Sequence, residues 1–202
     1  MSLTNAKTYG GTGAILSLLG GFIPRVGSLV TLLGLVLLLF AVKEIADEIE
    51  REDIFRDYLV GVILRFGALI VLILALVLAI GFAVLKGAPF KGMEEGFEGM
   101  RRLLAPILIG GLLAWILFVL GTYYTRKSYE KISSEVQVDT FNTVGFLYFV
   151  GGILLIALGI GLLVLLIGKI LEIVAYFSLP ESIKKEEVSE KVGGKQKWQR
   201  SW

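Results

Sequence analysis

The chain has 202 residues, of which 55% are hydrophobic and 19% are charged, and its formal net charge is +2. A soluble domain of this size would carry far more charge, so the composition indicates a protein whose solvent is largely lipid. Because the sequence contains neither Cys nor His, it excludes disulfides, metal sites built from those residues, and catalysis by a thiol or an imidazole.

The first apolar stretch runs from Thr12 to Ile23 and is followed by Pro24 and Arg25. A helix of this length spans only about 18 Å, which is too short for a hydrocarbon core of about 30 Å. The stretch could be an interfacial helix, a re-entrant half-helix, or the first part of a long helix that is broken at Pro24. We favour a broken or kinked entry into the first membrane span over a fifth span. The stretch has no small-residue cleavage site, so we expect it to stay attached.

Four longer uncharged blocks follow, and each could cross a bilayer as one helix. They comprise residues 26–42, 66–85, 103–124 and 140–168. The fourth block is longer than a span requires, so we expect it to be tilted or to continue into the interface. The sequence therefore predicts an all-α, polytopic membrane protein with about four transmembrane helices, whose first span is broken near Pro24. This transmembrane domain is expected to cover residues 1–181.

Residues 182–202 are polar and rich in Lys, with Trp198 and Trp202 near the end. We expect a flexible cytoplasmic tail, either unstructured or resting on an anionic membrane surface. Nucleic acid is not an expected partner, since no stacking platform or folded module supports it. If four spans are assumed, eleven Lys and Arg residues lie on the side of the termini and six on the other side. This count predicts a multi-pass protein of the cell membrane with cytoplasmic N- and C-termini.

The first and third connections between the blocks resemble each other. Glu48-Ile49 followed by Asp53-Ile54-Phe55 is echoed by Glu135-Val136 followed by Asp139-Thr140-Phe141. The alignment needs one gap, so two helix-hairpin repeats and coincidence both remain open. The first connection is also acidic, but it lacks the glycine and the ligand spacing of an EF-hand loop. We expect a solvated turn with ion pairs, and no metal site.

Glycines recur every seven residues in two series, and this spacing returns to nearly the same face of a helix. The series consist of Gly13, Gly20, Gly27 and Gly34, and of Gly145, Gly152 and Gly159. Small residues allow two helix backbones to approach closely, so we expect these glycines to pack the first span against the fourth. A subunit interface or a permeation groove is the alternative.

Three charged residues lie in or beside the apolar blocks. If the second span begins near Leu59, Arg65 lies within the membrane, where a charge is costly unless it snorkels, pairs or faces water. We expect Arg65 to extend to the outer headgroups, and the alternative is a contact with an anion or a substrate. Lys169 and Glu172 are three residues apart and are expected to pair at the inner interface.

The sequence contains no phosphate-binding loop, no nucleophile-elbow motif and no paired carboxylates within a span. We therefore expect neither an enzyme nor a cofactor. A non-enzymatic role in interaction or assembly within the lipid bilayer is favoured. The alternative is a small transporter or channel that acts as a homo-oligomer, because four helices leave little room for a lumen.

Five short stretches carry a family resemblance: AKTYGGTGAIL at residues 6–16, AVKEI at 41–45, DIF at 53–55, SYEKI at 128–132 and AYFSLPE at 175–181. Together they resemble an uncharacterised prokaryotic family of integral membrane proteins, the domain of unknown function 996. The tail lies outside the resemblance, and Arg25 is more polar than the family leads us to expect. The resemblance implies a multi-span, mostly archaeal membrane protein without an assigned activity. The scarcity of amides and the charge-dense loops also favour a source in a very hot environment.

Overall fold

A computed structural model describes residues 3–85, 96–157 and 159–181 of the chain. These residues form six α-helices: α1 (Thr4–Gly20), α2 (Gly27–Glu48), α3 (Glu52–Leu85), α4 (Gly96–Val136), α5 (Thr140–Leu154) and α6 (Ile160–Phe177). Within α2, α3, α4 and α6, four segments are long and apolar enough to cross a membrane. The prediction of an all-α membrane protein with about four spanning helices is confirmed. The predicted tail lies outside the described residues.

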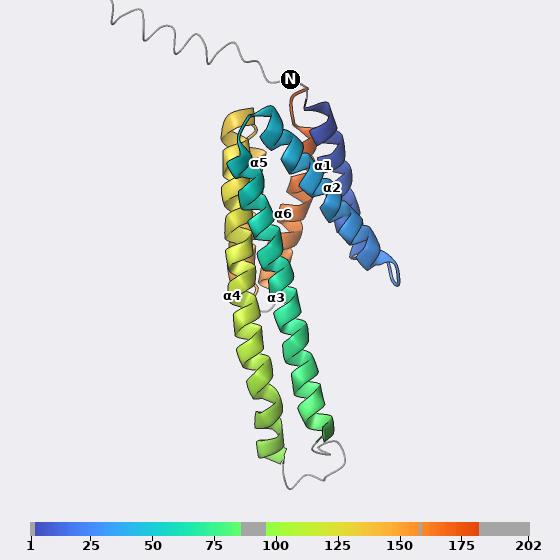
Figure 1. The fold of residues 1–202 in the computed structure, drawn as a ribbon, viewed down its shortest axis with the longest axis vertical. Helices are drawn as coiled ribbons and strands as arrows, with labels where there is room; N and C mark the ends of the chain where they lie inside the picture. The colour runs from blue at the N-terminus through green and yellow to red at the C-terminus, as the bar shows by residue number, and fades with distance from the viewer. Residues whose placement is uncertain (1–2, 86–95, 158, 182–202) are drawn as a thin grey trace, which may run out of the picture.

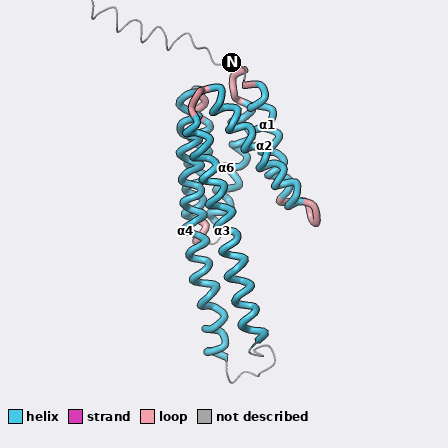
Figure 2. Tube along the Cα trace, in the orientation of Figure 1, coloured by secondary structure: helices cyan, strands magenta, loops and turns pink. Residues whose placement is uncertain are grey.

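The helices pair in chain order as three antiparallel hairpins, α1 with α2, α3 with α4, and α5 with α6 (Figure 1). The start of α1, the turn 49–51, the turn 137–139 and the end of α6 gather at one end of the bundle, which we call the terminal end. There the Leu3 amide donates a hydrogen bond to the Glu181 carbonyl oxygen, 3.0 Å away. Loops also lie at the far tips of the two shorter hairpins (Figure 2).

The α1–α2 hairpin brings two glycine backbones together twice. A Cβ atom added to Gly34 would lie 2.6 Å from the Gly13 carbonyl oxygen, and one added to Gly20 would lie 2.7 Å from the Gly27 carbonyl oxygen. The turn between these helices contains Pro24. The break predicted near Pro24 is confirmed, but the chain reverses there. The predicted kinked entry into one span is therefore replaced by a separate helix, α1, that packs back along α2.

The α3–α4 hairpin is much longer than the other two and extends well beyond them (Figure 1). The 34 residues of α3 give a length of about 51 Å at about 1.5 Å per residue. In its distal half, α3 buries small residues such as Ala75 and Ala79, and Ala75 meets Gly110 of α4. Large side chains such as Ile73 and Val77 are exposed. Small residues hold the two helices close together, and the large ones are left for lipid.

The fourth apolar block, predicted as one long span, is instead the α5–α6 hairpin. A Cβ atom on Gly151 would lie 2.9 Å from the Leu165 side chain, and one on Gly168 would lie 3.1 Å from the Tyr148 ring, so the two helices run antiparallel. Gly159 stands just before α6 with a φ of 94°, a conformation that favours glycine. The block is uniformly apolar, and hydropathy cannot reveal that the chain turns back inside it.

The two connections that resemble each other in sequence are also similar in structure. Glu50 has a φ of 60° and Gln137 a φ of 56°, so each turn contains one residue in the left-handed region. Both turns lie at the terminal end, the same end of the bundle as the start of α1 (Figure 1). The four-span prediction placed these connections on the side opposite the termini, and this is corrected. The reason is that α1 and α5 each add a reversal of direction that the prediction lacked.

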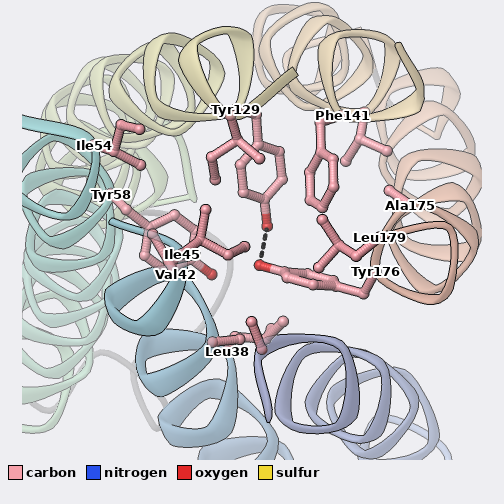
Figure 3. Close-up of a cluster of buried hydrophobic side chains, with 14 of the residues drawn as sticks. Leu38, Val42, Ile45, Ile54, Tyr58, Tyr129, Phe141, Ala175, Tyr176 and Leu179 are labelled. Atoms are coloured by element: carbon pink, nitrogen blue, oxygen red, sulfur yellow. Dashed lines mark hydrogen bonds between the residues drawn. The ribbon is translucent and has the colours of Figure 1, made fainter. Parts of the chain in front are cut away.

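The core lies near the terminal end, where side chains from different hairpins meet (Figure 3). The Phe141 and Tyr176 rings pack edge to face with centroids 5.1 Å apart, and the Tyr58 and Tyr129 rings stack at 5.8 Å. Helix α1 joins this core because Gly10 lies directly on the Tyr176 ring. The aromatic core thus holds the three hairpins together.

Candidate functional site

A buried carboxylate lies next to the aromatic core. Glu172 is only 1% exposed, and its Oε1 accepts a hydrogen bond from the Tyr129 hydroxyl. Its Oε2 accepts one from Lys169 Nζ at 2.5 Å. The Tyr129 hydroxyl is in turn 3.4 Å from that of Tyr176 (Figure 3). The pairing of Lys169 with Glu172 is confirmed, but Glu172 is enclosed by protein and does not lie at a solvated interface.

A cavity of about 380 Å³ lies beside this pair, between the tip of the α1–α2 hairpin and the helices of the other two hairpins. Two cationic side chains line it, Arg65 from α3 and Lys169 from α6. Hydroxyl groups come from Ser17, Thr122 and Tyr148, of which the first two already donate to backbone carbonyl oxygens one turn earlier in their own helices. Among the described residues, none of those that line the cavity is acidic. The cavity therefore offers positive charge and hydrogen-bond donors together.

Arg65 lies against α4, with its Cγ where a Cβ atom on Gly121 would meet it at 2.8 Å. Its Nε donates to the Gly61 carbonyl oxygen at 3.2 Å, one turn back on α3. Its Nη2 is buried and has no hydrogen-bond partner in the part of the chain that the structure describes. The sequence led us to expect a side chain that extends outward to the headgroups. Arg65 lines the cavity instead.

Tyr148, on α5, also lines the cavity. Its side chain is 7% exposed, and its hydroxyl is buried without a hydrogen-bond partner within the described ranges. Buried polar groups in proteins are usually paired, and leaving one unpaired costs about 1–3 kcal/mol. Arg65 Nη2 and the Tyr148 hydroxyl are therefore two donors without a partner on residues that line the same cavity.

The second glycine series packs α5 against α4. A Cβ atom on Gly145 would lie 3.0 Å from the Arg126 Cα, and one on Gly152 would lie 2.8 Å from the Thr122 Oγ1. Gly159 has no described atom within 4 Å of its added Cβ position. The first series joins α1 to α2, as described above. Each series therefore lies at a contact between helices adjacent in the chain, and not between the first span and the fourth.

The acidic connection is part of an ion-pair network at the terminal end. Arg51 pairs with Asp53 at 2.9 Å and with Glu135 at 2.7 Å, which links the turn 49–51 to α4. Lys131 pairs with Asp53 at 2.7 Å and with Asp57 at 2.5 Å. In the described residues, no group of three or more His, Cys, Asp or Glu side chains could hold a metal ion. This network fastens the α3–α4 hairpin at the terminal end.

Comparisons with known proteins place the chain in a family. A family model described as a protein of unknown function, DUF996, matches residues 30–170. The chain belongs to the DUF996 family. An uncharacterised protein of Methanocaldococcus jannaschii is 39% identical to this DUF996 protein over 186 residues, which is 92% of this chain and 98% of the relative. No solved structure matches the chain.

The family resemblance inferred from the short sequence stretches is confirmed. The residues that the DUF996 model matches include Arg65, Thr122, Tyr148 and Lys169, which are four of the polar residues that line the cavity. Glu172 lies two residues beyond the matched range. Because the family has no assigned function, a function for this DUF996 protein has to be argued from the geometry of its own site.

Proposed function

We propose that this DUF996 protein is a non-enzymatic membrane carrier that binds a small anionic group in the cavity beside Arg65 and Lys169. The observation that carries the proposal is the cavity itself, which reaches Arg65 and is lined by two cations and no acidic residue of the described chain. This observation favours the transporter alternative of the sequence over a role in assembly. A cavity lined by hydrogen-bond donors can bind a ligand, whereas a surface used for assembly needs no such cavity.

The charges of the two cations are balanced differently. Lys169 already pairs with the buried Glu172 carboxylate. The ion pairs found in the described residues do not include Arg65. Placing an unpaired guanidinium in a lipid environment costs free energy, and an anion bound to it by bidentate hydrogen bonds would offset that cost. Arg65 is therefore the principal anion-binding residue of the proposal, and Lys169 supports it.

The first prediction is that replacing Arg65 by Gln weakens anion binding by about tenfold to a hundredfold, as expected for the loss of charge-assisted hydrogen bonds. Arg65→Lys should lose part of the affinity, because an ammonium group lacks the planar fork. Calorimetric titration of the purified protein with inorganic phosphate, sulfate and hexyl phosphate would measure this, and uptake into proteoliposomes would test transport.

Arg56→Gln is the matched control, since Arg56 is an exposed residue of the same helix that does not line the cavity. Its affinity for the anions should equal that of the wild type. If the wild type binds none of the anions, or if Arg65→Gln binds them as tightly, the proposed function is wrong.

We also propose that the terminal end faces the cytoplasm. The described Lys and Arg residues at or near that end are Lys7, Lys43, Arg51, Arg56, Arg126, Lys127 and Lys131. By sequence, the α3–α4 connection and the first turns of α4 carry four, Lys86, Lys91, Arg101 and Arg102, and the α1–α2 turn, which ends well short of them, carries Arg25. Six more basic residues follow Glu181 in the tail. Since cytoplasmic connections are enriched in Lys and Arg, the excess favours cytoplasmic termini in the cell membrane.

The second prediction tests this orientation by cysteine labelling, and every label on the purified chain reports the introduced residue because the natural chain contains no Cys. Glu52 and Ser134 are exposed and lie beside the turns of the terminal end. In intact cells, Glu52→Cys and Ser134→Cys should be protected from a membrane-impermeant maleimide, and Lys91→Cys, between α3 and α4, should react. The four-span topology predicts the reverse for Glu52 and Ser134, so their labelling from outside would refute the proposed arrangement.

A further inference from the structure

The cavity lies away from the charged terminal end, because its lining residues include the last turn of α1 and the first turns of α6. Its innermost residues, Thr122 and Tyr148, are buried. Its rim consists of residues from the α1–α2 turn and from the first turns of α6. Among these, Phe22 is 72% exposed and Leu162 is 61% exposed. The entrance therefore lies between the tip of the α1–α2 hairpin and α6.

The surface around this entrance is apolar. Ile160 and Leu163 on α6 are exposed beside Leu162, and so are Ile23 and Val26 in the turn beside Phe22. Exposed apolar side chains on and beside helices that can cross a membrane face the hydrocarbon tails of lipids, because exposing so large an apolar patch to water would cost free energy. A molecule that enters the cavity by this route comes from the bilayer.

The cavity wall itself is divided into a polar and an apolar part. Arg65, Lys169 and the Tyr148 hydroxyl provide charge and donors, while Phe118 and Leu165 provide apolar surface. At about 380 Å³, the cavity is much larger than a single oxyanion and lies in the size range of small-molecule pockets. A ligand that fills it needs an acidic group and an apolar body.

We infer that the ligand is an anionic amphiphile that enters from the bilayer between the α1–α2 turn and α6. Its phosphate or carboxylate head lies between Arg65 and Lys169, and its chain leaves the cavity along Phe22 and Leu162. This inference rests on the proposed function and specifies the source of the bound anion as a membrane lipid or a lipid-like acid, in preference to an ion dissolved in water.

The test is a third prediction, made for the full chain in a neutral detergent. Calorimetric titrations with dihexanoyl phosphatidylglycerol, dihexanoyl phosphatidylcholine and inorganic phosphate separate the head from the chain. We expect phosphatidylglycerol to bind at least about tenfold more tightly than phosphatidylcholine or phosphate. It alone combines a net negative head for the cationic part of the wall with acyl chains for the apolar part. Arg65→Gln should remove this preference.

Leu162→Gln and Leu163→Gln form a matched pair at the entrance. The two leucines are neighbours with nearly equal exposure, 61% and 63%, but only Leu162 lines the cavity. Leu162→Gln should weaken the binding of phosphatidylglycerol and leave that of phosphate unchanged, whereas Leu163→Gln should change neither.

The possible outcomes separate the two proposals. If phosphate binds most tightly of the three and Leu162→Gln has no effect, the inference of an amphiphilic ligand is wrong and the proposed anion binding stands. If phosphatidylglycerol binds Arg65→Gln as tightly as the wild type, it binds elsewhere on the apolar surface, and the inference is also wrong. Binding of none of the three would defeat both proposals.

Discussion

Replacing Glu172 by Gln should lower the free energy of unfolding by about 3 kcal/mol, near the lower limit known for breaking a buried ion pair. The substitution keeps the shape of the side chain but removes the negative charge that Lys169 and the Tyr129 hydroxyl both bind. The Lys169 ammonium, whose side chain is 22% exposed, is then left without its counter-charge. Unfolding titrations in detergent, followed by circular dichroism, would measure the loss.

Two further variants separate the buried pair from a general charge effect. The double substitution Lys169→Met with Glu172→Gln should regain much of the stability, because no unpaired charge remains. Asp47→Asn breaks the exposed Lys43–Asp47 pair, whose side chains are 52% and 55% exposed, and should cost less than about 1 kcal/mol. If Glu172→Gln costs no more than Asp47→Asn, Glu172 is not enclosed as described.

Gly10→Leu should destabilise the protein by about 3 kcal/mol, at the upper end of the usual cost of overpacking, by forcing α1 away from α6. The added side chain would occupy the space of the Tyr176 ring. That ring cannot move aside, since Tyr176 is fully buried and Phe141 packs against it. Hydrogen–deuterium exchange should show faster exchange along α1, together with a lower melting temperature.

Thr12→Leu is the control for Gly10→Leu, because Thr12 is an exposed residue of the same helix. It adds a side chain of the same size class where no core residue stands in the way, so its melting temperature should remain close to that of the wild type. Equal melting temperatures for the two variants would mean that α1 does not pack against α6 through Gly10.

The apolar blocks predicted the spanning helices because charged residues mark where most of them end. Lys43 and Glu44 follow the apolar part of α2, and Arg126 and Lys127 follow that of α4. No charged residue marks the turn before α6 in the sequence. Residues on both sides of Gly159 are equally apolar, and a hydropathy profile gives the length of a block without its direction. The sequence therefore predicted the fold class correctly and the path of the chain only in part.

The site could be predicted only through its charges. Arg65 stood out because an Arg within an apolar helix is costly, and Lys169 and Glu172 stood out by their spacing. Tyr129 and Tyr148 gave no signal, since a Tyr in such a helix is an ordinary core or interface residue. Tyr129 is also 43 residues from Glu172 in the chain. The glycine spacing similarly indicated a close helix contact, but a periodicity does not identify the helix that fills it.

The unequal lengths of the three hairpins give the protein a wedge-shaped outline (Figure 1). Near the terminal end all three hairpins lie side by side, and farther along only α3 and α4 of the described chain continue. Embedded in a bilayer, such a wedge displaces more lipid from one leaflet than from the other. A bilayer deforms around a protein whose apolar surface does not match it, at a modest cost in free energy. The membrane around this protein should therefore curve, bulging toward the side of the terminal end.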